Sequence, residues 1–246
     1  MQNIWTIARR EYKRYFATPS AYVMAFMLFL VLGLVFYANV QYALTSLGQF
    51  VPDARVLFGP MVIVFLFAVP AVTMRLLAEE QKTGTLELLL TAPVRDAELV
   101  VGKWLGAFLF ILTLLAVTLV YPLLLNEMVQ PGIDQGPVLT GYLGFVLMTA
   151  ALVGVGVMVS SLFSNQLAAF VATLALFWLL WLMGMPVRAG AGGAGSELLR
   201  YLDFNQHFYP TLYEGILDLR DVVYYLSVTA ISLFLGSVII ETRRWR

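Results

Sequence analysis

Few residues in this 246-residue sequence could perform covalent or metal chemistry. The chain has no cysteine and a single histidine, His207, which excludes disulfides, thiolate nucleophiles and Cys-ligated metals. One histidine without clustered carboxylates is weak evidence for a metal, so we expect no metal site and place His207 at a surface or an interface. The sequence also lacks the P-loop, H-E-x-x-H and G-x-S-x-G motifs of ATPases, zinc proteases and serine hydrolases. We therefore predict no catalytic residue in this chain.

One stretch matches a nucleotide-binding motif by spacing alone. Gly190, Gly192 and Gly195 form G-x-G-x-x-G, but that motif binds dinucleotides only between a strand and a helix of a βαβ unit. Here it follows an apolar stretch long enough to cross a membrane. We interpret it as a flexible loop.

The segment Glu79–Glu98 could bind another protein. Its sequence, EEQKTGTLELLLTAPVRDAE, has an apolar centre between charged ends. Thr83-Gly84-Thr85 carries helix-start signals and Pro93 disfavours helix at the residue before it, which predicts a helix of about eight residues and about 12 Å. Asp96 is a candidate N-cap for a second helix that continues through Lys103.

Two interpretations of the short helix remain open. Its residues divide into an apolar cluster and a charged rim, which are Leu86, Leu89 and Leu90 against Glu79, Glu80, Lys82 and Glu87. An exposed apolar cluster with a charged rim is typical of a docking surface for another protein. The same pattern also suits a helix that lies flat on the membrane surface.

The elements that must position this segment are membrane helices. Apolar residues form 61% of the chain and charged residues 12%, whereas soluble domains are about half apolar and a quarter charged. Six apolar stretches are long enough to cross a hydrocarbon core of about 30 Å: Ser20–Val40, Phe58–Leu77, Trp104–Leu125, Val138–Leu162, Leu167–Pro186 and Val222–Ile240. The net charge is zero and offers no basic face to nucleic acid. We predict an all-α integral membrane protein, folded as one membrane domain over residues 1–246.

The connections between the spans divide by charge. Eleven of the fifteen Lys and Arg residues lie in the N-terminal tail, in residues 75–103 or at the C-terminus, so the positive-inside rule places both termini and the loop 78–103 in the cytosol. Residues 1–19 place Ile4, Ile7, Ala8, Tyr12 and Tyr15 at helical spacing among basic residues, which predicts an amphipathic interface helix. Residues 187–221 form an external loop with one or two short helices.

The spans carry almost no ionisable side chain. Secondary transporters and proton pumps place such groups at membrane depth, so an ion-driven carrier and an intramembrane enzyme are both poor fits. The chain can move cargo only with energy from another protein, and an apolar path suits lipid-linked, hydrophobic or polypeptide cargo better than small ions. Gly102 and Gly106 form G-x-x-x-G at the start of the third span and permit close helix approach.

The stretch RLLAEEQKTGTLELLLTAPVRDAELVVGKWLGAF resembles the first cytosolic loop of ABC-2-type exporter permeases, in which an acidic pair, a Gly-Thr, a Leu-Glu-rich stretch and a Pro recur in this order. ARREYKRYFATPSAYV resembles the family's N-terminal interface helix. DLRDVVYYLSVTAISLFL with ETRRW is similar to the last span of the gliding-motility-associated permease branch. The resemblance covers essentially the whole chain.

The resemblance implies a membrane subunit that pairs with a second copy or a paralogue and binds a separate ABC ATPase dimer. ATP and Mg would be bound by that ATPase, and this chain would hold no cofactor. Residues 83–91 would be the coupling helix, with the ATPase-contacting residues Glu79, Glu80, Thr83, Gly84, Thr85, Leu86, Glu87, Leu89, Leu90 and Pro93. Arg9, Arg10 and Tyr12 of the interface helix would brace the same contact, and the link Ser160–Gln166 would add a smaller one.

The expected function is therefore export driven by an ABC ATPase across a bacterial or archaeal cytoplasmic membrane, with a periplasmic or surface subunit allowed. One rival is a mechanotransmitter that passes ATPase motion to an external partner without moving cargo, although such proteins often carry a larger external domain. A second rival is a structural scaffold, which would have no ATPase partner. Membrane lipid is a partner under every hypothesis.

Overall fold

A computed structural model describes residues 2–46, 52–84, 95–190, 193 and 195–244. Every regular element in these residues is helical, which confirms the predicted all-α class. Six helical stretches are long and apolar enough to cross a membrane, namely Ala21–Thr45, Ala54–Thr83, Asp96–Met128, Gln135–Leu162, Gln166–Arg188 and Leu219–Thr242. The six predicted spans are confirmed, with ends displaced by several residues.

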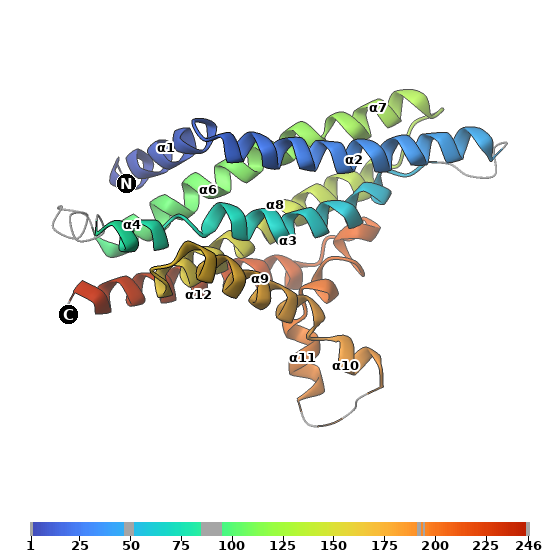
Figure 1. Ribbon diagram of the computed structural model, residues 1–246. Helices are drawn as coiled ribbons and strands as arrows, with labels where there is room; N and C mark the ends of the chain where they lie inside the picture. The colour runs from blue at the N-terminus through green and yellow to red at the C-terminus, as the bar shows by residue number, and fades with distance from the viewer. Residues whose placement is uncertain (1, 47–51, 85–94, 191–192, 194, 245–246) are drawn as a thin grey trace.

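The helices run in this order: α1 Gln2–Phe16, α2 Pro19–Thr45, η1 Ala54–Leu57, α3 Phe58–Thr73, α4 Ala78–Thr83, α6 Asp96–Thr118, α7 Val120–Met128, α8 Gln135–Leu162, α9 Gln166–Leu182, α10 Met185–Arg188, α11 Ser196–Leu202, η2 Phe204–His207, η3 Leu212–Glu214 and α12 Leu219–Arg244. Figure 1 shows the long helices running roughly side by side. Helices α1 and α4 and both chain termini lie at one end, which we call the base.

Helix α8 is the centre of the bundle. It packs against α3, α6, α9 and α12. In its most apolar stretch of 18 residues, 78% is buried. Small residues allow this crowding, since Gly141 lies against Phe58 and Gly156 against Thr73 with no room for a side chain at either glycine. The close contacts make α8 the element against which the other spans are positioned.

The second span breaks near the base, and α8 stabilises the break. Helix α3 ends at Thr73 and α4 begins at Ala78. The Ser160 hydroxyl of α8 accepts hydrogen bonds from the backbone N–H groups of Leu77 at 3.2 Å and Ala78 at 3.1 Å, and it donates one to the Met74 carbonyl at 3.3 Å. The link between α8 and α9, predicted over Ser160–Gln166, is shorter in the structure because α8 continues to Leu162 and α9 begins at Gln166.

Within the described part of residues 187–221 lie three short helices, α11, η2 and η3, where one or two were predicted, and His207 connects this segment to α12. Its Nδ1 lies 2.8 Å from the Asp221 carboxylate and its Nε2 lies 2.8 Å from the Tyr201 carbonyl, while its ring stacks on Tyr224 at a centroid distance of 3.8 Å. Only 6% of His207 is exposed. Of the two predicted positions, surface or interface, the surface is wrong: His207 lies buried at the contact with α12, where hydrogen bonds at both ring nitrogens offset the cost of burial.

Candidate functional site

The amphipathic helix α1 lies against the start of α6. A Cβ atom built on Gly102 would come within 2.8 Å of the Ile7 Cβ, and one built on Gly106 within 2.7 Å of the Glu11 Cβ. Real Cβ atoms do not approach so closely, so the two glycines let the helices touch along their backbones. Further along, the Tyr12 hydroxyl hydrogen-bonds the Thr113 hydroxyl at 3.0 Å.

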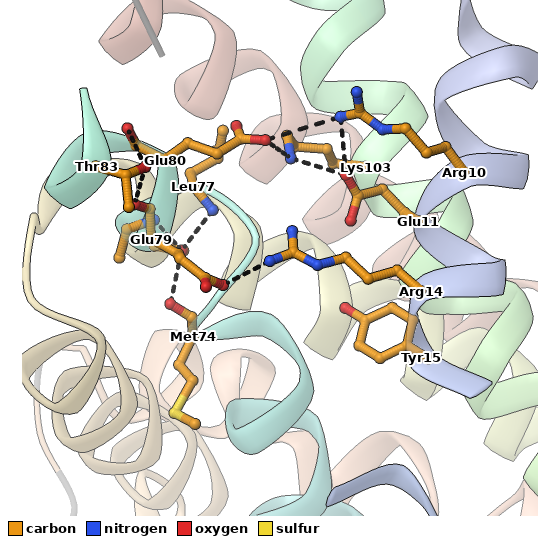
Figure 2. Close-up of polar contacts among 12 residues, drawn as sticks. Arg10, Glu11, Arg14, Tyr15, Met74, Leu77, Glu79, Glu80, Thr83 and Lys103 are labelled. Atoms are coloured by element: carbon orange, nitrogen blue, oxygen red, sulfur yellow. Dashed lines mark hydrogen bonds and ion pairs between the residues drawn. The ribbon is translucent and has the colours of Figure 1, made fainter. Parts of the chain in front are cut away.

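This close packing buries a group of charges at the base. Lys103 of α6 is 0% exposed, and its ammonium lies 2.7 Å from the Glu80 carboxylate of α4 and 3.1 Å from the Glu11 carboxylate of α1. Arg10 reaches the Glu11 carboxylate at 3.3 Å and the Glu80 carboxylate at 3.9 Å. Figure 2 shows the four side chains converging from three helices. Two cations thus face two carboxylates: Lys103, Glu11 and Glu80 are buried, whereas Arg10 contacts them from the exposed side.

The electrostatics of Glu11 follow from these neighbours. Burial alone would raise the pKa of Glu11, but the attraction and hydrogen bonds of Lys103 and then of Arg10 more than offset burial, so its pKa lies below the ordinary value of 4.5. A lowered carboxylate pKa means that folding stabilises the charged form. This contribution is complete above about pH 4.5 and is lost as the pH falls through the lower folded-state pKa.

A second ion pair lies beside the first. Arg14 of α1 donates to the Glu79 carboxylate of α4 at 2.9 Å, and both side chains are partly exposed, which limits its contribution to stability. We call Arg10, Glu11, Arg14, Glu79, Glu80 and Lys103 the base cluster. It connects α1, α4 and α6 and includes Glu79 and Glu80, two of the three acidic residues that were predicted to contact an ATPase. Glu80 is turned inward toward Lys103, while Glu79 lies at the surface.

The other predicted coupling residues divide at Gly84. Thr83 is the last residue of α4, its hydroxyl donating to the Glu79 carbonyl at 2.9 Å. Gly84 ends that helix with φ 71°, a left-handed conformation that favours glycine. Thr83 and Gly84 therefore end α4, and the coupling helix predicted over residues 83–91 lies outside the described residues from Thr85 onward. The remaining candidates, Thr85, Leu86, Glu87, Leu89, Leu90 and Pro93, lie outside the described residues.

The N-terminus of α6 also differs slightly from the prediction. The N-cap of α6 is Arg95 and not Asp96. The Glu98 carboxylate accepts a hydrogen bond from the Arg95 backbone N–H at 3.2 Å, which satisfies a donor that the helix itself leaves unpaired. Asp96 instead occupies the first turn, where its charge favours the helix dipole.

This arrangement is suited to mechanical work. Helices α4 and α6 flank residues 85–94 in the sequence, and the base cluster ties both helices to α1. A force applied to that segment would reach three helices through buried ion pairs. Among the described residues, no group of three or more His, Asp and Glu could hold a metal ion.

Sequence reasoning missed Lys103, Glu11 and Arg14 as partners. Two features of the sequence pointed to Glu11 and Lys103. Glu11 is the one acidic residue in a basic tail, and Lys103 precedes a run of 23 residues without Asp, Glu, Lys or Arg. A lone charge of each sign at a membrane boundary predicts a pair, but only the fold places the two within contact. The predicted residues Arg9, Arg10 and Tyr12 all lie on α1, where Arg10 contacts Glu11 and Glu80 while Arg9 and Tyr12 line one groove beside α6.

Comparison with known protein families identifies the family of the chain. The family described as ABC-2 family transporter protein matches residues 37–193, which is more than half of the chain and includes the second to fifth spans. No curated protein matches the chain significantly. Members of this family are the membrane components of ABC transporters and are not themselves the ATPase. The match over residues 37–193 shows that this chain belongs to the ABC-2 family of transporter proteins, and the six membrane-length helices agree with that membership.

Proposed function

We propose that this chain is the permease subunit of an ABC exporter and that it converts ATPase motion into helix movement through the base cluster. The single observation that carries the proposal is the burial of Lys103 between Glu11 and Glu80, because it links the two helices beside residues 85–94 to α1. In this proposal residues 85–91 supply the coupling helix, and the base cluster passes its displacement onward.

The assembly follows from the family. An ABC permease works with an ABC ATPase and as a dimer, and we propose that the second permease is an identical or paralogous chain. ATP and Mg would be bound by the ATPase dimer at the base, so that both termini face the cytosol of a bacterial or archaeal cell. The gliding-motility-associated branch remains the proposed place of this chain within the family.

The proposed cargo is apolar, lipid-linked or polypeptide-like. Residues 21–52, 56–74, 104–126, 135–187 and 222–240 contain no Asp, Glu, Lys or Arg. A path lined by such helices offers no charge to replace the hydration shell of a small ion. Closure of the ATPase at the base would tilt whole helices, since a bilayer requires each span to keep its backbone hydrogen bonds.

We expect Leu89→Arg and Glu87→Lys to release the ATPase while the chain stays in the membrane. The first substitution places a charge in the apolar centre of the docking helix, and the second reverses a charge at its rim. Each should remove a binding hot spot and raise the Kd for the ATPase by about thirtyfold or more. The measurement is the amount of ATPase that co-purifies with each variant. Leu198→Arg and Glu197→Lys make matched changes on α11, away from the base, and should leave the yield unchanged. Undiminished binding by both loop variants would remove the coupling-helix assignment.

Transport itself distinguishes an exporter from a mechanotransmitter. In proteoliposomes that contain the chain and its ATPase, we expect ATP-dependent movement of a lipid-linked or hydrophobic cargo, and none with an ATPase-dead partner. ATP hydrolysis that depends on the chain, without flux of any cargo class tried, would favour the mechanotransmitter. The scaffold hypothesis instead predicts that no ATPase co-purifies.

A further inference from the structure

The base carries an apolar groove that the base cluster does not use. It has a volume of about 570 Å³ and lies between α1 and α6, within the size range of pockets that bind small molecules. Trp5, Arg9, Tyr12 and Lys13 of α1 form one wall, and this spacing places them on one face of the helix. Leu109 and Leu112 contribute to the other wall from within the third span. The groove therefore begins on an interface helix and continues along a membrane-spanning one.

Two of the basic residues of α1 form ion pairs, and the other two line the groove. Arg10 and Arg14 turn toward Glu11, Glu80 and Glu79. Arg9 and Lys13 line the groove, are exposed, and form no ion pair with the described residues. The residues that line the groove include no Asp or Glu. An apolar groove with two uncompensated cations at its rim is complementary to a molecule with an anionic head and an apolar tail.

We propose that this groove binds an anionic phospholipid from the leaflet in which α1 lies. One acyl chain would lie along Leu109 and Leu112, and the phosphate would accept hydrogen bonds from Arg9 and Lys13. Trp5, which is 57% exposed, would lie at the head-group level that tryptophan prefers. The bound lipid would hold α1 against α6 beside the base cluster, so that membrane charge affects the same contact that the ion pairs maintain. The proposal does not depend on whether the chain exports cargo or transmits force.

The test is quenching of Trp5 by brominated lipid in phosphatidylcholine nanodiscs that contain the full chain. The difference in fluorescence between the unmodified protein and Trp5→Phe isolates Trp5 from the other four tryptophans. We expect phosphatidylglycerol with brominated acyl chains to quench Trp5 at roughly thirtyfold lower mole fraction than phosphatidylcholine with the same chains, the effect of two basic residues near a membrane surface.

Charge variants then locate the site. Arg9→Gln with Lys13→Gln should abolish the preference for phosphatidylglycerol. Lys82→Gln with Arg95→Gln removes the same charge from exposed positions outside the groove and should keep it. Equal quenching by the two lipids in the unmodified protein would overturn the proposal. So would an absence of Trp5 quenching by either lipid, the result expected if a second copy of the chain covers the groove.

Discussion

Lys103→Met should detach α1 and α4 from α6. The substitution keeps an unbranched side chain in a fully buried position but leaves Glu11 and Glu80 facing each other without the ammonium that lies within 3.1 Å of both. Removing one partner of a buried ion pair costs about 3–5 kcal/mol, a large part of the roughly 5–15 kcal/mol by which folded proteins are stable. We expect a marked fall in the thermal unfolding temperature of the purified protein.

Labelling can show that the loss is local to the base. Because the chain has no cysteine and Ala8 is fully buried, Ala8→Cys introduces a single thiol that reports on α1 docking. Its reaction with a water-soluble maleimide should be slow alone and fast when combined with Lys103→Met. Lys82→Met alters an exposed lysine and should have neither effect.

Neutralising the orphaned carboxylates tests the cause. Lys103→Met combined with Glu11→Gln and Glu80→Gln should recover much of the lost stability, because neutral amides are less costly to bury than unpaired carboxylates. If Lys103→Met alone remained as stable as the unmodified protein, and the introduced thiol stayed protected from the maleimide, the base cluster would have no structural role.

The spans were predictable from sequence for a simple physical reason. A bilayer requires a long uncharged helix, and no stretch in this sequence other than the six has that length and composition. Short helical structure within residues 187–221 was also expected, and α11, η2 and η3 lie there. In each case the signal is local, and the fold does not need to be known to interpret it.

The contacts of the candidate site were not predictable in the same way. Glu11 and Lys103 are 92 residues apart, and helical periodicity does not say which helix a charged residue will meet. Periodicity also placed Glu80 on a charged rim, yet its carboxylate turns inward because Lys103 is there. Glycine is found at both ends of helices, and the sequence alone did not reveal that Gly84 ends a helix that begins at Ala78. The sequence left His207 at either a surface or an interface, because it does not reveal that Asp221 approaches the imidazole.

Gly106→Ala should also loosen α1, by a steric route. The added Cβ would lie 2.7 Å from the Glu11 Cβ and 2.9 Å from the Ala8 carbonyl oxygen. The backbone of α1 cannot yield without carrying Glu11 away from Lys103. Alanine gains about 1 kcal/mol of helix propensity over glycine, whereas overpacking costs about 1–3 kcal/mol, so we expect net destabilisation and, in the Ala8→Cys background, faster labelling of the introduced thiol. Gly33→Ala is the control, because its Cβ would meet only the Tyr121 hydroxyl at 3.4 Å and should leave stability equal or higher.

The losses of unfolding free energy caused by Lys103→Met and by Gly106→Ala should not be additive. Lys103→Met and Gly106→Ala act on one docking contact, and once α1 has detached, a second disruption has nothing left to break. A double-mutant cycle on unfolding should therefore show a coupling between them of about 0.5–3 kcal/mol, as for residues that share partners. Lys103→Met and Gly33→Ala should be additive, since Gly33 lies on α2 and shares no partner with the base cluster. Additivity in both cycles would mean that the glycine pair and the buried charges stabilise the base independently, and that α1 is not held as one unit.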